Sequence, residues 1–181
     1  MIAEFPPGLL MIVGAIFVPF VRGHLRSAYM LALPLLGIWQ LVLLDPGTFG
    51  AMSVFGFELT HVRVDKLSLI FGYIFYIAAA IGIIFAWHIK DLAEQASALV
   101  YVGAAVGATF AGDLITLFVY WELAALSSVF LIWAGRTERA YSAGMRYLMI
   151  QILSGVLLAA GAVLLASETG SVAFNNIGID S

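Results

Sequence analysis

The chain of 181 residues is unusually apolar: 63% of its residues are hydrophobic, only 10% are charged, and the net charge is −3. Soluble domains carry about a quarter charged residues, so this composition predicts an integral membrane protein. No basic cluster is present that could bind phosphates, which excludes nucleic acid as a partner. The lack of cysteine excludes disulfides, iron–sulfur ligation and thiol catalysis within the chain.

Six apolar segments are each long enough, or nearly so, to cross a bilayer. We expect helices because an open strand cannot satisfy its backbone hydrogen bonds in lipid. The first segment follows Glu4 with no Lys or Arg before it, so it lacks the basic start of a secretory signal and is expected to be a retained span. The expected spans lie near residues 5–21, 27–44, 67–87, 96–111, 114–134 and 141–166.

The longest connection, residues 45–66, is expected to be an outer loop. Its FELTHVRV stretch, which follows Gly56, has the β-branched and aromatic residues typical of a short hairpin. Asp65 directly precedes the third apolar run and is expected to cap that helix, since Asp is a preferred N-cap residue. Residues 167–181, rich in Gly, Asn and Ser, are expected to form a second outer loop.

The basic residues favour one orientation in the membrane. With the N-terminus outside, six Lys and Arg residues fall on the inner side and two on the outer side. Trp87 and Trp133 then lie at the inner ends of the third and fifth spans, where amphipathic rings prefer to sit. The sequence therefore predicts a multi-pass protein of the plasma (inner) membrane with its N-terminus outside. The inner residues are Arg22, Arg26, Lys90, Arg136, Arg139 and Arg146, and the outer ones are Arg63 and Lys66.

Glu122 lies almost at the midpoint of the apolar run from residue 114 to residue 134. At about 1.5 Å per residue this run spans roughly 30 Å, so the carboxylate is expected near the membrane midplane. Placing an acid there costs roughly 2.5 to 3.5 kcal/mol, and such residues usually serve an ion path, a proton relay or a buried pair. Burial disfavours the ionised form, and a nearby cation favours it. Glu122 is therefore the candidate proton carrier.

Candidate partners of Glu122 lie on the sixth segment. Arg146 is the nearest cation and a candidate counter-charge, although a long cationic side chain near a helix end can instead extend to the membrane surface. Tyr147, Gln151 and Ser154 are spaced by four and three, so they share a face that could form a polar path beside Glu122. The alternative is that these three side chains only hydrogen-bond between helices.

Small residues recur every four positions on the fourth segment, at Gly103, Gly107 and Ala111. This pattern lets another helix approach closely, and we expect the face to await a helix outside the six segments. The three histidines have no ligand-like spacing, so no metal site is assigned. Nucleotide-binding and nucleophile motifs are absent, and no cofactor is expected.

The stretch GDLITLFVYWELAALSSVFLIWAGRTERAYSAGMRYLMIQILSG resembles the fifth and sixth helices of the antiporter-like subunits of Mrp-type multisubunit cation/proton antiporters, membrane-bound hydrogenases and respiratory complex I. VRVDKLSLIFGYIF is similar to the start of that family's third helix, and WEL is the most specific part. The resemblance covers nearly the whole chain and is greatest to the Mrp D-type subunits.

The resemblance implies an all-α polytopic membrane fold, with about six transmembrane helices forming the first part of a fourteen-helix subunit. It implies that Glu122 is the fifth-helix glutamate that takes part in proton translocation and pairs with a seventh-helix lysine. The chain ends before that helix, so residues 167–181 would lead to a missing seventh helix, and the buried Lys would come from other helices. The chain by itself is not expected to transport ions.

The function expected from these features is that of a membrane subunit of a monovalent cation (Na⁺ or K⁺)/proton antiporter. It would be a transporter subunit and not an enzyme, with other membrane subunits and the lipid bilayer as partners. One alternative is a proton-pumping subunit of a complex I-like or membrane-bound hydrogenase redox complex. The other is a membrane scaffold in which Glu122 makes an inert hydrogen bond.

Overall fold

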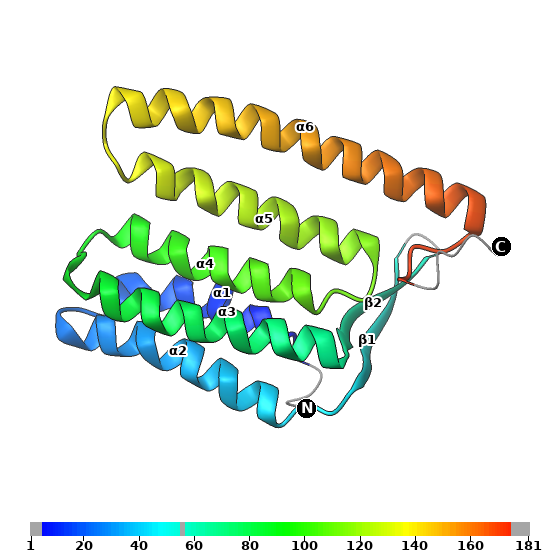
Figure 1. Ribbon diagram of the computed structural model, residues 1–181, viewed down its shortest axis with the longest axis horizontal. Helices are drawn as coiled ribbons and strands as arrows, with labels where there is room; N and C mark the ends of the chain where they lie inside the picture. The colour runs from blue at the N-terminus through cyan, green and yellow to red at the C-terminus, as the bar shows by residue number, and fades with distance from the viewer. Residues whose placement is uncertain (1–4, 55–56, 175–181) are drawn as a thin grey trace.

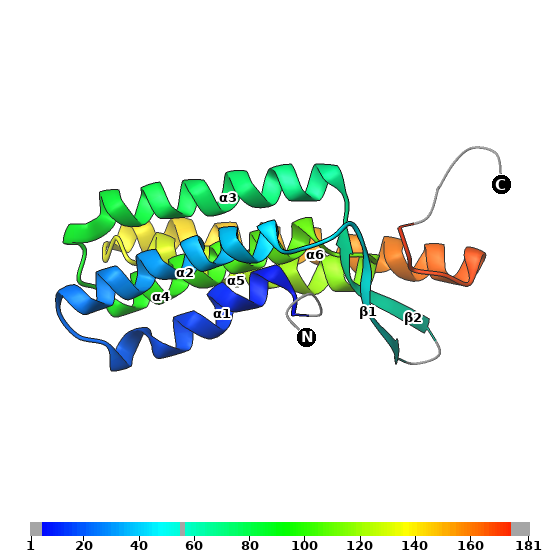
Figure 2. The ribbon, with the colours of Figure 1, turned by 90° about the horizontal axis from the view of Figure 1, so that it is seen from below.

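A computed structural model describes residues 5–54 and 57–174. Its long helices run side by side, and a two-stranded hairpin lies at one end of them (Figures 1 and 2). The expectation of an all-α membrane fold with about six helices is confirmed. The helices are α1 (Pro7–Phe17), α2 (His24–Val42), α3 (Lys66–Phe85), α4 (Leu92–Thr109), α5 (Leu114–Trp133) and α6 (Glu138–Thr169), with short 3₁₀ turns η1 (Val18–Phe20) and η2 (Ala86–His88) and strands β1 (Gly47–Val54) and β2 (Phe57–Val64).

Within residues 5–54 and 57–174, four helices are long and apolar enough to cross a membrane by length and composition: α2, α3 (with η2), α5 and α6. Helix α1 is shorter, with 11 residues, and α4 has 18 residues. Helix α6 has 32 residues and extends beyond the expected range of 141–166 at both ends. At about 1.5 Å per residue it is nearly 50 Å long, so it can cross the bilayer and project from it.

Polar side chains define where the helices begin. Asp65 accepts a hydrogen bond from Ser68 N, and Ser68 Oγ accepts one from Asp65 N, which confirms the expected cap of α3. Asp91, Asp113 and Thr137 cap α4, α5 and α6, and in each case the side chain accepts a hydrogen bond from a backbone N–H of the first turn. These caps satisfy backbone N–H groups that have no partner within the helix.

Helix α4 is the centre of the bundle, because α1, α3 and α5 all pack on it (Figure 1). Gly8 of α1 lies so close to Gly103 and Gly107 that a Cβ on Gly8 would overlap the α4 backbone, and a Cβ on Gly103 would overlap α1. A Cβ on Gly107 would overlap the ring of Tyr120 from α5. The close approach predicted for this small-residue face is therefore confirmed. The expectation that the face awaits a helix outside the six segments is wrong, because α1 and Tyr120 already occupy it.

The hairpin lies against the ends of α4, α5 and α6. Strands β1 and β2 pair antiparallel, and the tip at residues 55–56, which includes Gly56, lies outside the described residues. The α4–α5 connection joins β2 through Arg63 N to Phe110 O (2.8 Å) and Gly112 N to Thr60 O (3.0 Å). On its other side, Leu114 N donates to Val172 O at 3.0 Å. The connection is thus held between the hairpin and the segment after α6.

Candidate functional site

Glu122 is the ninth residue of the 20-residue helix α5 and therefore lies near its middle. The surrounding residues from Val119 to Leu126 are otherwise apolar apart from Tyr120. The Glu122 side chain is half-buried and points toward α6. Its Oε1 atom is inaccessible to solvent and has no hydrogen-bond partner among the described residues. Such a carboxylate oxygen can hold a proton or accept one from a transient donor.

Gly155 of α6 makes the space for this carboxylate. A Cβ at position 155 would overlap Glu122 Oε1, and the three atoms nearest to that point all belong to the Glu122 carboxyl group. The buried residues of α6 are all small, so α5 and α6 can approach each other closely along their length. These residues are Gly144, Gly155, Ala162 and Ala166.

Two of the three candidate path residues lie on the side of α6 that faces α5. Gln151 is half-buried and one turn from Gly155. Tyr147 is also half-buried, and its hydroxyl is hydrogen-bonded to the hydroxyl of Ser128 on α5 at 2.9 Å. Ser154, in contrast, is exposed and lies at the edge of this face. Tyr147 and Gln151 thus extend a polar line from Gly155 toward the α5–α6 turn.

Arg146 does not lie near Glu122. Its side chain is exposed. Arg146 and Gly155 are nine residues apart, and because an α-helix turns by about 100° per residue, they lie on opposite sides of α6. Within the described residues the ion pairs are Arg63–Asp65 (3.8 Å) and Arg136–Asp91, and neither includes Glu122. This geometry gives no support to Arg146 as the counter-charge.

The Asp91–Arg136 pair links two turns at one end of the bundle. Asp91 caps α4, while Arg136 lies in the turn between α5 and α6 and donates to Asp91 Oδ2. The backbone N–H of Glu94, and to a lesser extent the Arg136 guanidinium, hold the pKa of Asp91 below its ordinary value of 3.8. This pair therefore stays ionised at neutral pH and connects the α3–α4 and α5–α6 turns.

Asp113 is a buried carboxylate that the sequence reasoning did not single out. Its side chain is completely buried, with Oδ1 accepting from Thr116 N (2.7 Å) and Oδ2 accepting from Thr60 N and Thr116 Oγ1 (both 2.8 Å). The sequence did contain a pattern that predicts a helix cap here: Asp113 directly precedes an apolar run, and Thr116 follows three residues later. Both oxygens of Asp113 therefore accept hydrogen bonds that hold α5 and β2, whereas Glu122 Oε1 has no partner among the described residues. Gly155 was also missed, because nothing in the sequence shows which residue of α6 faces Glu122.

The chain is similar to known membrane proteins. Residues 111–179, which include Glu122 and helix α6, match the family described as NADH:quinone oxidoreductase/Mrp antiporter, TM. The A-type subunit of a Na⁺/H⁺ antiporter from Alkalihalophilus pseudofirmus is 28% identical over 184 aligned positions, covering 90% of this chain. The A1-type subunit of a Na⁺/H⁺ antiporter from Staphylococcus aureus is 28% identical over 131 positions, covering 68% of this chain.

These relatives are much longer proteins. The matches cover 23% of the A. pseudofirmus protein and 16% of the S. aureus protein. The chain therefore corresponds to less than a quarter of the curated relatives it matches. Both relatives are A-type subunits, and the D-type assignment stays a prediction.

The fold is shared with two respiratory membrane complexes. A chain of the archaeal membrane-bound sulfane sulfur reductase aligns with a TM-score of 0.81 and 22% identity, over 93% of this chain and 28% of that one. A chain of respiratory complex I from Thermus thermophilus aligns with a TM-score of 0.77 and 18% identity, over 95% of this chain and 39% of that one. The family match and the relatives show that the chain is similar to part of an antiporter-like membrane subunit, and the two solved structures show the same fold.

Proposed function

We propose that this chain is part of a subunit of a multisubunit Na⁺ or K⁺/proton antiporter, and that Glu122 carries the proton. The observation that supports the proposal is the Glu122 carboxylate, which lies between α5 and α6 with a buried oxygen that has no partner among the described residues. A purely structural carboxylate, such as Asp113, uses its oxygens in hydrogen bonds. The Na⁺/H⁺ antiporter subunits among the relatives agree with this chemistry.

The counter-charge for Glu122 comes from outside these six helices. Ionising a carboxylate at this depth requires a cation nearby, and Arg146 lies on the far side of α6. A Lys on another helix of the same complex is the cation that the family resemblance implies. It would stabilise the ionised form when it approaches and favour proton uptake when it withdraws.

Protons reach Glu122 from the end of the bundle that carries Arg136. Gln151 lies one turn from Gly155, and the hydrogen-bonded hydroxyls of Tyr147 and Ser128 lie one turn further in the same direction. Each of these groups can both donate and accept a hydrogen bond, so they can order a chain of water molecules. By the distribution of Lys and Arg, this end is the cytoplasmic side of the plasma membrane, and the N-terminus lies outside.

A second function is supported by the folds of the two solved complexes. Both belong to respiratory assemblies, and their chains share this fold over more than 90% of its length. In that setting Glu122 would have the same proton chemistry, driven by a distant redox reaction instead of a cation gradient. The proton step is common to both functions, and only the driving reaction differs.

The test is Glu122→Gln, which keeps the size of the side chain and removes its charge. Vesicles that contain the complete complex should lose cation-dependent proton movement, measured with a pH-sensitive dye, at a normal level of protein. The matched control is Glu138→Gln, which changes an exposed glutamate at the start of α6. Normal activity in Glu122→Gln would contradict the carrier role. Proton movement that depends on an electron donor, and not on Na⁺ or K⁺, would identify the redox function.

A further inference from the structure

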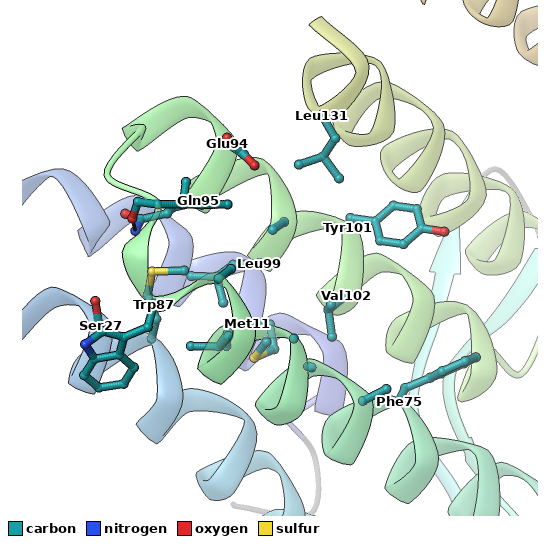
Figure 3. A pocket seen from close by; sticks show the side chains of 18 of the residues that line it. Met11, Ser27, Phe75, Trp87, Glu94, Gln95, Leu99, Tyr101, Val102 and Leu131 are labelled. Carbon is teal, nitrogen blue, oxygen red and sulfur yellow. Dashed lines mark hydrogen bonds between the residues drawn. The ribbon is translucent and has the colours of Figure 1, made fainter. Parts of the chain in front are cut away.

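The indole of Trp133 closes one end of the contact between α5 and α6. Trp133 is the last residue of α5, and the three atoms nearest to the point where a Cβ of Gly144 would lie all belong to its ring. Gly144 is buried on α6, so the ring occupies the space of the missing side chain. Leu131, two residues earlier, lines the cavity beside α4 instead (Figure 3). The rotation of α5 therefore turns Trp133 toward α6 and away from that cavity.

The indole lies between a surface pocket and the hydrogen-bonded hydroxyls of Tyr147 and Ser128. The pocket, of about 560 Å³, is formed at the α5–α6 turn, and Trp133 and Tyr141 both line it. Tyr141 precedes Gly144 by three residues and Tyr147 follows it by three, so at about 100° per residue the two tyrosines lie on opposite sides of Gly144. The Trp133 ring stacks on Tyr141, with 5.7 Å between the ring centroids. A ring in this position separates the pocket from the hydroxyls of Tyr147 and Ser128.

The indole N–H is not satisfied in this position. Trp133 Nε1 is buried and has no acceptor among the described residues. A buried indole N–H usually has a hydrogen-bond partner, and leaving it without one is unfavourable. The pocket is bordered by the exposed residues Arg136 and Thr137, so a ring turned into it would place its N–H in contact with water. Ring packing thus favours the position on Gly144, while the N–H favours the pocket.

The backbone that follows Trp133 is strained and is held in place by an ion pair. Arg136 has a φ of 49°, in the left-handed region that is uncommon for residues other than glycine. Its side chain donates to Asp91, which caps α4, so the turn is fixed to a neighbouring helix. Strained residues of this kind cluster at functional sites and switch regions. Because the turn is fixed, the movement between the two positions is a rotation of the Trp133 side chain.

We propose that Trp133 is the gate between the pocket at the α5–α6 turn and the proton path to Glu122, an inference that rests on the function proposed above. In the closed position the ring lies on Gly144, and water in the pocket does not reach Tyr147. In the open position the ring lies in the pocket, and water continues the hydrogen-bonded line from Tyr147 outward. The gate thereby limits proton exchange with this side of the membrane and keeps the path dry when it is closed.

The test measures access to residue 128 and not transport. Ser128→Cys places a single thiol beside Tyr147, because the chain has no cysteine. The complete complex in nanodiscs is treated with a small cationic methanethiosulfonate, and the labelling rate of this chain is followed by mass spectrometry. Trp133→Ala removes the ring, and Gly144→Ala fills the closed position with a methyl group while keeping the ring. Leu131→Ala is the matched control, because it removes a large side chain from the other side of the same helix.

An open state of this kind is populated to about 10% or less, so a chain that is always open should react at least about tenfold faster. We expect this increase in Trp133→Ala and in Gly144→Ala, and an unchanged rate in Leu131→Ala. The gate is refuted if Ser128→Cys alone reacts as fast as it does with Trp133→Ala, or if Leu131→Ala accelerates labelling equally. Labelling needs no proton transfer, so normal transport in Glu122→Gln would contradict the proposed function and leave this result unchanged.

Discussion

Glu122 on α5 and Gly155 on α6 form a matched pair: the carboxylate occupies the space that a Cβ at position 155 would need. Glycine in the middle of a helix costs about 1 kcal/mol relative to alanine, so an interior glycine needs a packing reason. Here the reason is the buried carboxylate. The position of the candidate proton carrier on α5 therefore depends on the absence of a side chain at residue 155 of α6.

Gly155→Ala should therefore impair the site without removing any charge. The added methyl group displaces the carboxylate, and a displacement of about 1 Å can lower activity by about two orders of magnitude. We expect cation-dependent proton movement, measured in vesicles with the complete complex, to fall about 10- to 100-fold. Gly161→Ala lies on the same helix, meets no neighbour and should keep wild-type activity. Equal activity of the two variants would show that Glu122 does not need this space.

Asp113→Ala should destabilise the fold. The change leaves three donors without their acceptor: the buried N–H and hydroxyl of Thr116 and the partly buried N–H of Thr60. We expect a loss of about 2 to 4 kcal/mol, measured as a lower midpoint of thermal unfolding in detergent. Thr137→Ala removes an exposed cap with one hydrogen bond and should cost about 1 kcal/mol. The structural role of Asp113 would be refuted by equal losses in the two variants.

Labelling of two serines on α6 tests the orientation. Ser142 and Ser167 are both exposed and lie roughly 37 Å apart along the helix, at about 1.5 Å per residue. The chain has no cysteine, so Ser142→Cys and Ser167→Cys each carry a single thiol. With the N-terminus outside, a membrane-impermeant reagent should label Ser167→Cys in intact cells and should label Ser142→Cys only after the cells are opened. The opposite pattern would invert the topology.

The Asp65 cap should make stability depend on pH in the acid range. The hydrogen bond from Ser68 N lowers the pKa of Asp65 below its ordinary value of 3.8. The pKa of Asp65 is therefore lower in the folded chain than in the unfolded chain. For this reason the contribution of the ionised cap to the free energy of unfolding is complete above about pH 4 and is lost as the pH falls through the folded pKa. Asp65→Ser keeps a capping oxygen that does not titrate. The difference in melting temperature between wild type and variant should shrink between pH 6 and pH 3, and a constant difference would contradict this account.

The sequence alone determined the class of protein and the position of its main candidate residue along a helix. Hydropathy is a local property, so the runs of apolar residues predicted a membrane fold of about six helices, as the structure shows. The cap at Asp65 was predictable for the same reason, because it involves residues only three positions apart. The position of Glu122 near the middle of α5 followed from counting residues along one helix.

Only the tertiary structure decided which helices meet and which side chains face one another. The small residues of α4 indicated close packing, but the fold alone shows that Gly8 and Tyr120 occupy that face. In the same way, Gly155 and not Arg146 faces Glu122, because contacts between helices depend on how each helix is rotated about its axis. Lipid-facing positions are as apolar as the interior, so hydropathy carries little information on that rotation.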